Sequence, residues 1–88
     1  MLAKTIQLQD SVFFHARPAA WIASEAKKYQ SMIMLTANGQ IVDAKKSLAI
    51  MRLGVMEDKT VEIISDGSDE LEAMQAIVHV LEELQAVR

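Results

Sequence analysis

One short stretch, His15-Ala16-Arg17-Pro18, combines residue types that can receive and hold a phosphoryl group. It lies between a strand-like segment and an alanine-rich segment, which places it at the predicted first turn of a helix. The first backbone N–H groups of a helix lack intrahelical partners, and the helix dipole there attracts negative charge. The same positive end disfavours an imidazolium, so His15 tends toward its neutral, nucleophilic form near pH 7. A phosphoimidazole formed there would face free amides and the guanidinium of Arg17.

The same residues also have plainer explanations. A histidine beside an arginine at a helix start is more often an ordinary surface feature, and Pro18 suits a helix start because its missing N–H is not needed there. Ala16 and Pro18 contribute backbone geometry, since proline fixes φ and biases Arg17 away from helical torsions. The local pattern alone is therefore compatible both with phosphoryl chemistry and with an ordinary surface role.

The composition indicates one globular domain spanning residues 1–88. The chain is 51% hydrophobic and 24% charged, which argues against disorder and is enough for one modest core. A formal net charge of −3 argues against general binding to nucleic acid or to anionic membranes. There is no cysteine, no signal-peptide core and no segment able to span a bilayer. We expect a soluble cytoplasmic monomer.

Hydrophobic periodicity and turn residues predict seven elements in the order βαββαβα. Strands with one apolar face need helices packed on that face, which gives a two-layer α+β domain. Periodicity alone leaves a ferredoxin-like arrangement open. The predicted strands cover residues 4–9, 32–36, 40–43 and 60–64, and the predicted helices cover residues 18–28 and 47–52 and a final segment that starts at Ser68.

Local signals support several of these boundaries. Asn38-Gly39 is a strong two-residue hairpin signal, because both positions tolerate positive φ. Ser68 is a suitable N-cap for the last helix. The predicted core comprises the stripe Ala19, Ile22, Ala23 and Ala26, the pair Ile50 and Leu53, and the stripe Leu71, Met74, Ile77 or Val78, Leu81 and Leu84.

The stretch His15-Ala16-Arg17-Pro18-Ala19, about fifteen residues into a chain of this size, resembles HPr, the histidine-containing phosphocarrier of the bacterial sugar phosphotransferase system. Asn38-Gly39, the run 44–54 and the segment 67–70 also fall where that family has similar segments. The resemblance implies an open-faced sandwich of four antiparallel strands with three helices on one face. It also implies that His15 takes a phosphoryl group from enzyme I and passes it to a IIA component, with Arg17 stabilising the phosphate. The protein would be a carrier, not an enzyme, and would need no cofactor.

Three residues are candidates for partner contact. Trp21 falls off the apolar stripe of its helix, one turn beyond Arg17, which favours at least partial exposure. Leu48 and Met51 share a face of the short helix and could extend the same patch. The resemblance implies docking in this region. For a lone tryptophan, the simpler explanation is core packing.

Two positions depart from the family pattern. Phe13 stands where most members have glycine, and phenylalanine disfavours the positive φ that glycine permits. Lys46 stands where many members from low-GC Gram-positive bacteria have a serine that a dedicated kinase phosphorylates. The neighbouring Ser47 points in another direction, because one helical step rotates a side chain by roughly 100°. Its simplest role is to cap the short helix.

The alternative function is that of an HPr paralogue with a regulatory role or a dedicated non-sugar phosphotransfer role. Phe13 and Lys46 favour it, whereas the retained His15 and Arg17 favour the carrier. A third possibility, a small RNA-binding module, has little support, since the basic residues look scattered and no GXXG loop is present. His79 reads as a surface residue flanked by acids, and no third ligand joins the two histidines into a metal site.

Overall fold

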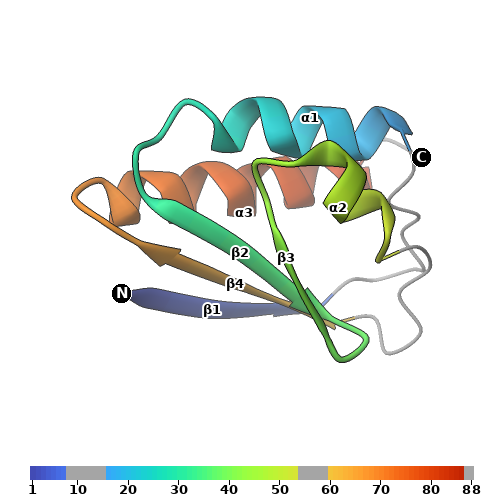
Figure 1. The fold of residues 1–88 in the computed structure, drawn as a ribbon, viewed down its shortest axis with the longest axis horizontal. Coiled ribbons are helices and arrows are strands. Elements are labelled where there is room, and N and C mark those ends of the chain that lie inside the picture. Colours follow the sequence, from blue (N-terminus) through green and yellow to red (C-terminus); the bar gives the residue numbers. More distant parts are fainter. Residues whose placement is uncertain (8–15, 54–59, 87–88) are drawn as a thin grey trace.

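The chain forms two layers, a sheet of four strands and three helices that cover one face of it, in this computed structural model (Figure 1). The structure describes residues 1–7, 16–53 and 60–86. The predicted α+β order βαββαβα and the open-faced sandwich are confirmed. The elements are β1 (Leu2–Gln7), α1 (Ala16–Ala26), β2 (Met32–Ala37), β3 (Gln40–Asp43), α2 (Ser47–Met51), β4 (Thr60–Asp66) and α3 (Glu70–Ala86).

The strands lie in the order β1-β4-β2-β3, and each neighbouring pair is antiparallel. β2 and β3 are joined by the predicted hairpin, in which Asn38 and Gly39 have φ of 52° and 75°. Positive φ at both central positions gives the turn a twist that matches the strands it connects. The last two residues of the first predicted strand, Leu8 and Gln9, lie outside the described residues.

The core lies between the sheet and the helices. As predicted, Ala19, Ile22, Ala23 and Ala26 of α1 are buried, and so are Ile50 and Leu53. Alternation along β2 and β4 places every second side chain under the helices. The largest fully buried side chains are Ile22, Ile33, Leu35, Ile50, Ile63, Ile77 and Leu81.

The last helix differs from the prediction at its start. It begins at Glu70, and the first intrahelical bond runs from the Ala73 N–H to the Asp69 carbonyl at 2.9 Å, so Ser68 lies too early to be its N-cap. Leu71 is 56% exposed, while the small Ala73 is buried. The buried stripe of α3 therefore includes Ala73 and excludes Leu71. Because the side chain of Ala73 is only a methyl group, the first turn of α3 can pack closely against its neighbours.

The first helix also begins differently from the prediction, whereas the second begins at Ser47 as predicted but with a different cap. α1 begins at Ala16 rather than Pro18, so Arg17 is helical despite the proline that follows it. A proline within the first helical turn removes only an N–H that has no partner there, and the bias against helical torsions at Arg17 is overcome. α2 is preceded by Lys46 at the N-cap, which makes no side-chain capping bond, so Ser47 is the first helical residue and not the cap.

Candidate functional site

The start of α1 presents the residues on which the phosphoryl-acceptor hypothesis rests. His15 and Phe13 lie outside the described residues. Ala16, the residue after His15, is the first of α1, and Arg17 follows with an exposed side chain. Pro18 is half-buried. A guanidinium at the positive end of an 11-residue helix, two residues after His15, is available to an anion arriving at this end of the molecule.

α1 and α2 pack side by side, and a shallow depression runs between them. Its α1 side is formed by Ala20, Ala23, Ser24 and Lys27, and Ser47 closes it on the α2 side. Small side chains predominate here, which leaves room for groups from a partner. The depression gives the α1–α2 face a shape that a docking protein can enter.

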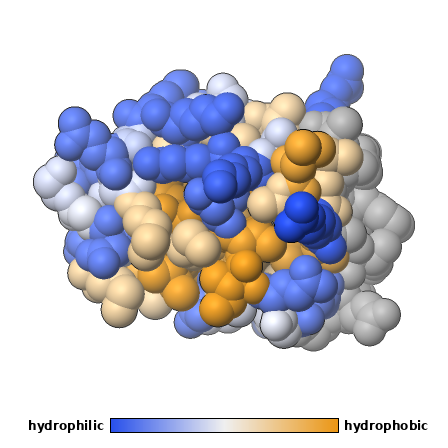
Figure 2. Space-filling view, in the orientation of Figure 1, coloured by the Kyte–Doolittle hydropathy of each residue, from blue (hydrophilic) through white to orange (hydrophobic). Residues whose placement is uncertain are grey.

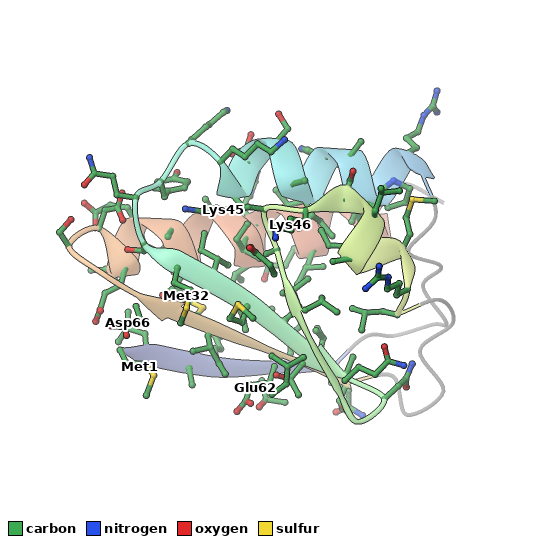
Figure 3. All side chains as sticks on the ribbon, in the orientation of Figure 1. Met1, Met32, Lys45, Lys46, Glu62 and Asp66 are labelled. Atoms are coloured by element: carbon green, nitrogen blue, oxygen red, sulfur yellow. The ribbon has the colours of Figure 1, made fainter. Side chains whose placement is uncertain are left out.

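Positive charge gathers on this same face. Six of the nine lysine and arginine residues, but only two of the twelve acidic residues, fall between residues 16 and 53. Lys27, Lys45, Lys46 and Arg52 line a second depression around α2. The Nζ of Lys45 donates a hydrogen bond to the Tyr29 carbonyl at 2.8 Å, which holds this lysine of the cluster in place. Figure 3 shows Lys45 and Lys46 beside the helices.

The basic residues that look scattered in the sequence are thus concentrated by the fold. Their signal was present in the sequence as a segregation of charge along the chain, with the acidic residues mainly in the remainder. Long-range attraction from such a patch favours approach by an acidic surface. This basic surface is a feature of the site that the motif-based analysis missed.

Trp21 lies on a different flank of α1. It is 38% exposed and lines a groove between α1 and α3, together with Tyr29, Gln75 and His79. Glu25 also lines this groove, and its carboxylate accepts a hydrogen bond from the Lys28 ammonium at 2.9 Å. That bond raises the pKa of Lys28 above its ordinary value.

The two candidate residues of α2 lie elsewhere. Leu48 is 73% exposed and Met51 is 37% exposed, and Leu48 borders the basic depression. The structure therefore places Leu48 with the lysines, whereas Trp21 lines a depression shared with α3. Leu48 and Trp21 therefore line two separate depressions, one on the α2 side of α1 and the other on its α3 side.

The described residues offer little for other kinds of site. His79 is exposed on α3, with its Nε2 3.9 Å from a Glu83 carboxylate oxygen. Within residues 1–7, 16–53 and 60–86, no group of three or more histidine, cysteine or acidic side chains is arranged to hold a metal ion. In the same part of the chain, no helix combines the length and apolar character needed to cross a membrane.

Comparison with known proteins identifies the family. Residues 2–83 match the family model for the PTS HPr component phosphorylation site. The HPr-like protein Crh of Halalkalibacterium halodurans is 33% identical over 82 residues, which cover 93% of this chain and 98% of that protein.

Two solved structures are similar over nearly the whole fold. HPr from Thermoanaerobacter tengcongensis gives a TM-score of 0.86 at 34% identity, covering 100% of this chain and 99% of that one. Crh of Bacillus subtilis, a domain-swapped dimer, gives a TM-score of 0.74 at 30% identity, covering 94% and 95%. The match of sequence, fold and coverage shows that this chain belongs to the HPr family of phosphocarrier proteins of the phosphotransferase system.

Proposed function

We propose that this protein accepts a phosphoryl group on His15 from phospho-enzyme I and passes it to a IIA component of a sugar phosphotransferase system. The observation that carries the proposal is the family match over residues 2–83, combined with an exposed Arg17 at the start of α1, two residues after His15. HPr proteins are phosphoryl carriers and not catalysts, so the acceptor residue is itself the functional group.

The proposed transfer requires only the chain's own side chains. A ring nitrogen of neutral His15 attacks phosphorus, and the bond that joins phosphorus to enzyme I breaks in line with it. The phosphoryl group arrives with negative charge, which Arg17 and the free amides of the helix start balance. In the second transfer the IIA component is the attacking partner, the bond from phosphorus to His15 breaks, and the imidazole is restored.

The docking surface in this proposal is the α1–α2 face. Its small-residue depression and its lysines and arginine suit an acidic partner that must bring a reacting group to the start of α1. Leu48 supplies an exposed apolar anchor beside the charges, and Met51 extends it. Trp21 would be contacted only by a partner that also reaches over to the α3 side of α1.

Incubation with enzyme I and phosphoenolpyruvate, followed by intact-mass measurement, tests the proposal. We expect one added phosphoryl group, labile in acid and stable in alkali, that is absent from His15→Ala. His79→Ala is the matched control, because it removes the other histidine from an exposed position on α3. Undiminished labelling of His15→Ala would reject His15 as the acceptor.

The second candidate is a regulatory paralogue or a carrier in a dedicated non-sugar phosphotransfer chain. It is favoured by the similarity to Crh, an HPr-like protein connected with catabolite repression, and by Phe13 and Lys46. The two candidates separate in one assay: a regulatory protein is phosphorylated poorly or fails to pass the group to IIA. Rapid label transfer to a IIA protein favours the sugar carrier.

We further propose a monomer as the working form. The competing arrangement is a swapped dimer such as that of Bacillus subtilis Crh, and HPr from Thermoanaerobacter tengcongensis has also been solved as a dimer. Size-exclusion chromatography with light scattering distinguishes them directly. A dimeric mass at micromolar concentration would show that the dimer, and not the monomer, is the working form.

A further inference from the structure

The face of the sheet that the helices leave uncovered has an unusual surface for an exposed sheet. Strand alternation places one set of residues beneath the helices and the other set on this face. No element within the described residues covers it. Met32 and Ile41, which belong to this set, are 50% and 64% exposed. Figure 2 shows apolar surface over β2 and β3, in the lower part of the view.

The strand register organises this face into rows. Ala3 pairs with Ile64, and Ile64 pairs with Met34, so an apolar row crosses three strands. In the next row Thr5, Glu62 and Thr36 are paired, and Ile41 follows on β3. On the other side of the apolar row, Asp66 pairs with Met32.

Along β4 the apolar row is therefore bordered by an acid on each side. Glu62, Ile64 and Asp66 alternate on this face, with about 7 Å between successive members because each is two residues further along the strand. Figure 3 shows Glu62 and Asp66 extending from the strands on the side away from the helices. An apolar ridge between two positive charges would complement this pattern.

No described strand contributes a positive side chain to this face, but the N-terminal ammonium of Met1 lies 3.7 Å from a carboxylate oxygen of Asp66 and offsets part of that charge. Lys4 pairs with the buried Ile63 and so belongs to the helix-covered side. Asp43, opposite Met34, adds a third carboxylate. Glu62 forms no ion pair with any described residue. A second copy of the chain would bring the same acids against these acids, which disfavours self-association here.

We propose that the uncovered face of the sheet is a docking surface for a protein segment that presents apolar side chains flanked by lysine or arginine. Methionines at residues 32 and 34 give it an adaptable apolar centre, and the carboxylate of Glu62, supported by that of Asp66, selects the charge of the partner. This face is separated from the basic α1–α2 face by the thickness of the domain. The protein therefore has two surfaces of opposite charge, and a partner on the sheet leaves α1 and α2 accessible.

Two synthetic peptides test the proposal on the full chain. One is an amphipathic peptide of leucine and lysine, and the other has glutamate in place of each lysine. Titration of isotope-labelled protein, followed by amide chemical shifts, should show the lysine peptide perturbing β1, β2 and β4 while the amides of α1 and α2 stay unchanged. The glutamate peptide should not bind. Added salt should weaken binding of the lysine peptide.

Variants then separate charge from shape. The double variant Glu62→Gln/Asp66→Asn keeps side-chain size and should weaken binding roughly three- to tenfold, as the loss of exposed ion pairs would. Most of the loss should come from Glu62, because Asp66 already pairs with the N-terminal ammonium. Met32→Thr should weaken it as well. Leu48→Thr on α2 is the matched control, since it removes an exposed apolar side chain from the other face. The thermal midpoints of all the variants confirm that they are folded.

Four outcomes would overturn the proposal. Shifts confined to α1 and α2, equal binding of the glutamate peptide, or equal weakening by Leu48→Thr would each show that the sheet face is not selective. Concentration-dependent dimerisation perturbing the same strands would assign the face to a second copy of the chain instead.

Discussion

Asp69 ties the start of α3 to the start of β2 through Ser31. One carboxylate oxygen of Asp69 accepts hydrogen bonds from both the hydroxyl and the backbone N–H of Ser31, the latter at 2.9 Å, and the other oxygen accepts the Gln30 N–H at 2.9 Å. Ser31 is buried. Two segments nearly forty residues apart are thereby joined by one side chain. These bonds, led by that from the Ser31 hydroxyl, lower the pKa of Asp69 below its ordinary value of 3.8.

Asp69→Asn should lower the thermal midpoint at neutral pH, because an amide offers one acceptor oxygen where the carboxylate offers two. A pKa that is lowered in the folded state means that the ionised carboxylate stabilises the fold. That contribution is fully present above about pH 3.8 and is lost as the pH falls through the lowered pKa. The difference in midpoint between the natural chain and the variant should therefore shrink in strong acid.

Circular dichroism melting at a series of pH values measures this difference. Glu82→Gln is the control, since it removes an exposed carboxylate from the same helix. A midpoint difference for Asp69→Asn that stays constant from neutral pH into strong acid would contradict the assigned role of the carboxylate.

Gly67→Ala should destabilise the fold by roughly 2–4 kcal/mol, the sum of backbone strain and a steric clash. Gly67 has φ of 154°, and a Cβ there would lie 2.7 Å from the Ser31 Cα. Gly39→Ala is the comparison: its φ is 75°, but nothing lies within 4 Å of an added Cβ, so it should cost only about 1–2 kcal/mol. Urea unfolding measures both, and equal losses would argue against the clash with Ser31.

Arg17→Ala should slow phosphoryl transfer from enzyme I about tenfold or more, equivalent to roughly 1.5–3 kcal/mol for a charge-assisted contact. The thermal midpoint should change little, because the side chain is exposed. Lys4→Ala is a suitable control, as it removes a positive charge from the exposed strand β1. Rapid-quench measurement of label transfer tests this prediction. Identical transfer rates for Arg17→Ala and the natural chain would show that Arg17 is only a surface charge.

Trp21→Ala should weaken binding of enzyme I while costing about 1–3 kcal/mol of stability, since the residue is 38% exposed. Ile22→Ala, at a fully buried position, should cost roughly 2–5 kcal/mol. The Trp21 fluorescence of the natural chain should change on addition of enzyme I. Unchanged fluorescence together with unchanged affinity would place Trp21 outside the interface.

An ATP-dependent HPr kinase should phosphorylate the natural chain poorly, and Lys46→Ser should be a better substrate. Lys46 is exposed before the first turn of α2, whereas Ser47 is a half-buried helical residue. Lysine brings a positive charge where a phosphoserine would add about two negative ones, so it does not imitate the phosphorylated form. Mass spectrometry measures the extent, and stoichiometric phosphorylation of the natural chain at Ser47 would contradict this expectation.

The sequence by itself determined the order of elements, the hairpin at Asn38-Gly39 and the buried stripe of α1. These depend on spacing within a few residues, where periodicity and local torsional preference act directly. The family resemblance likewise rested on short stretches, residues 15–19 first, together with Asn38-Gly39 and the segments 44–54 and 67–70. In contrast, the predicted cap at Ser68 and the predicted burial of Leu71 were wrong. Both depend on where α3 meets β2 and β4, and that contact sets the first residue and the phase of the helix.

Only the tertiary structure decided how distant side chains combine. Lys27 and Lys46 are nineteen positions apart in the chain, and packing of α2 against α1 places both at one depression. Trp21 is four residues from Arg17, yet packing of α1 between α2 and α3 turns it toward the α3 groove. The acidic borders of the uncovered sheet likewise follow from strand register. Residues in contact across a sheet or between helices are set by packing of the whole chain, which no local pattern specifies.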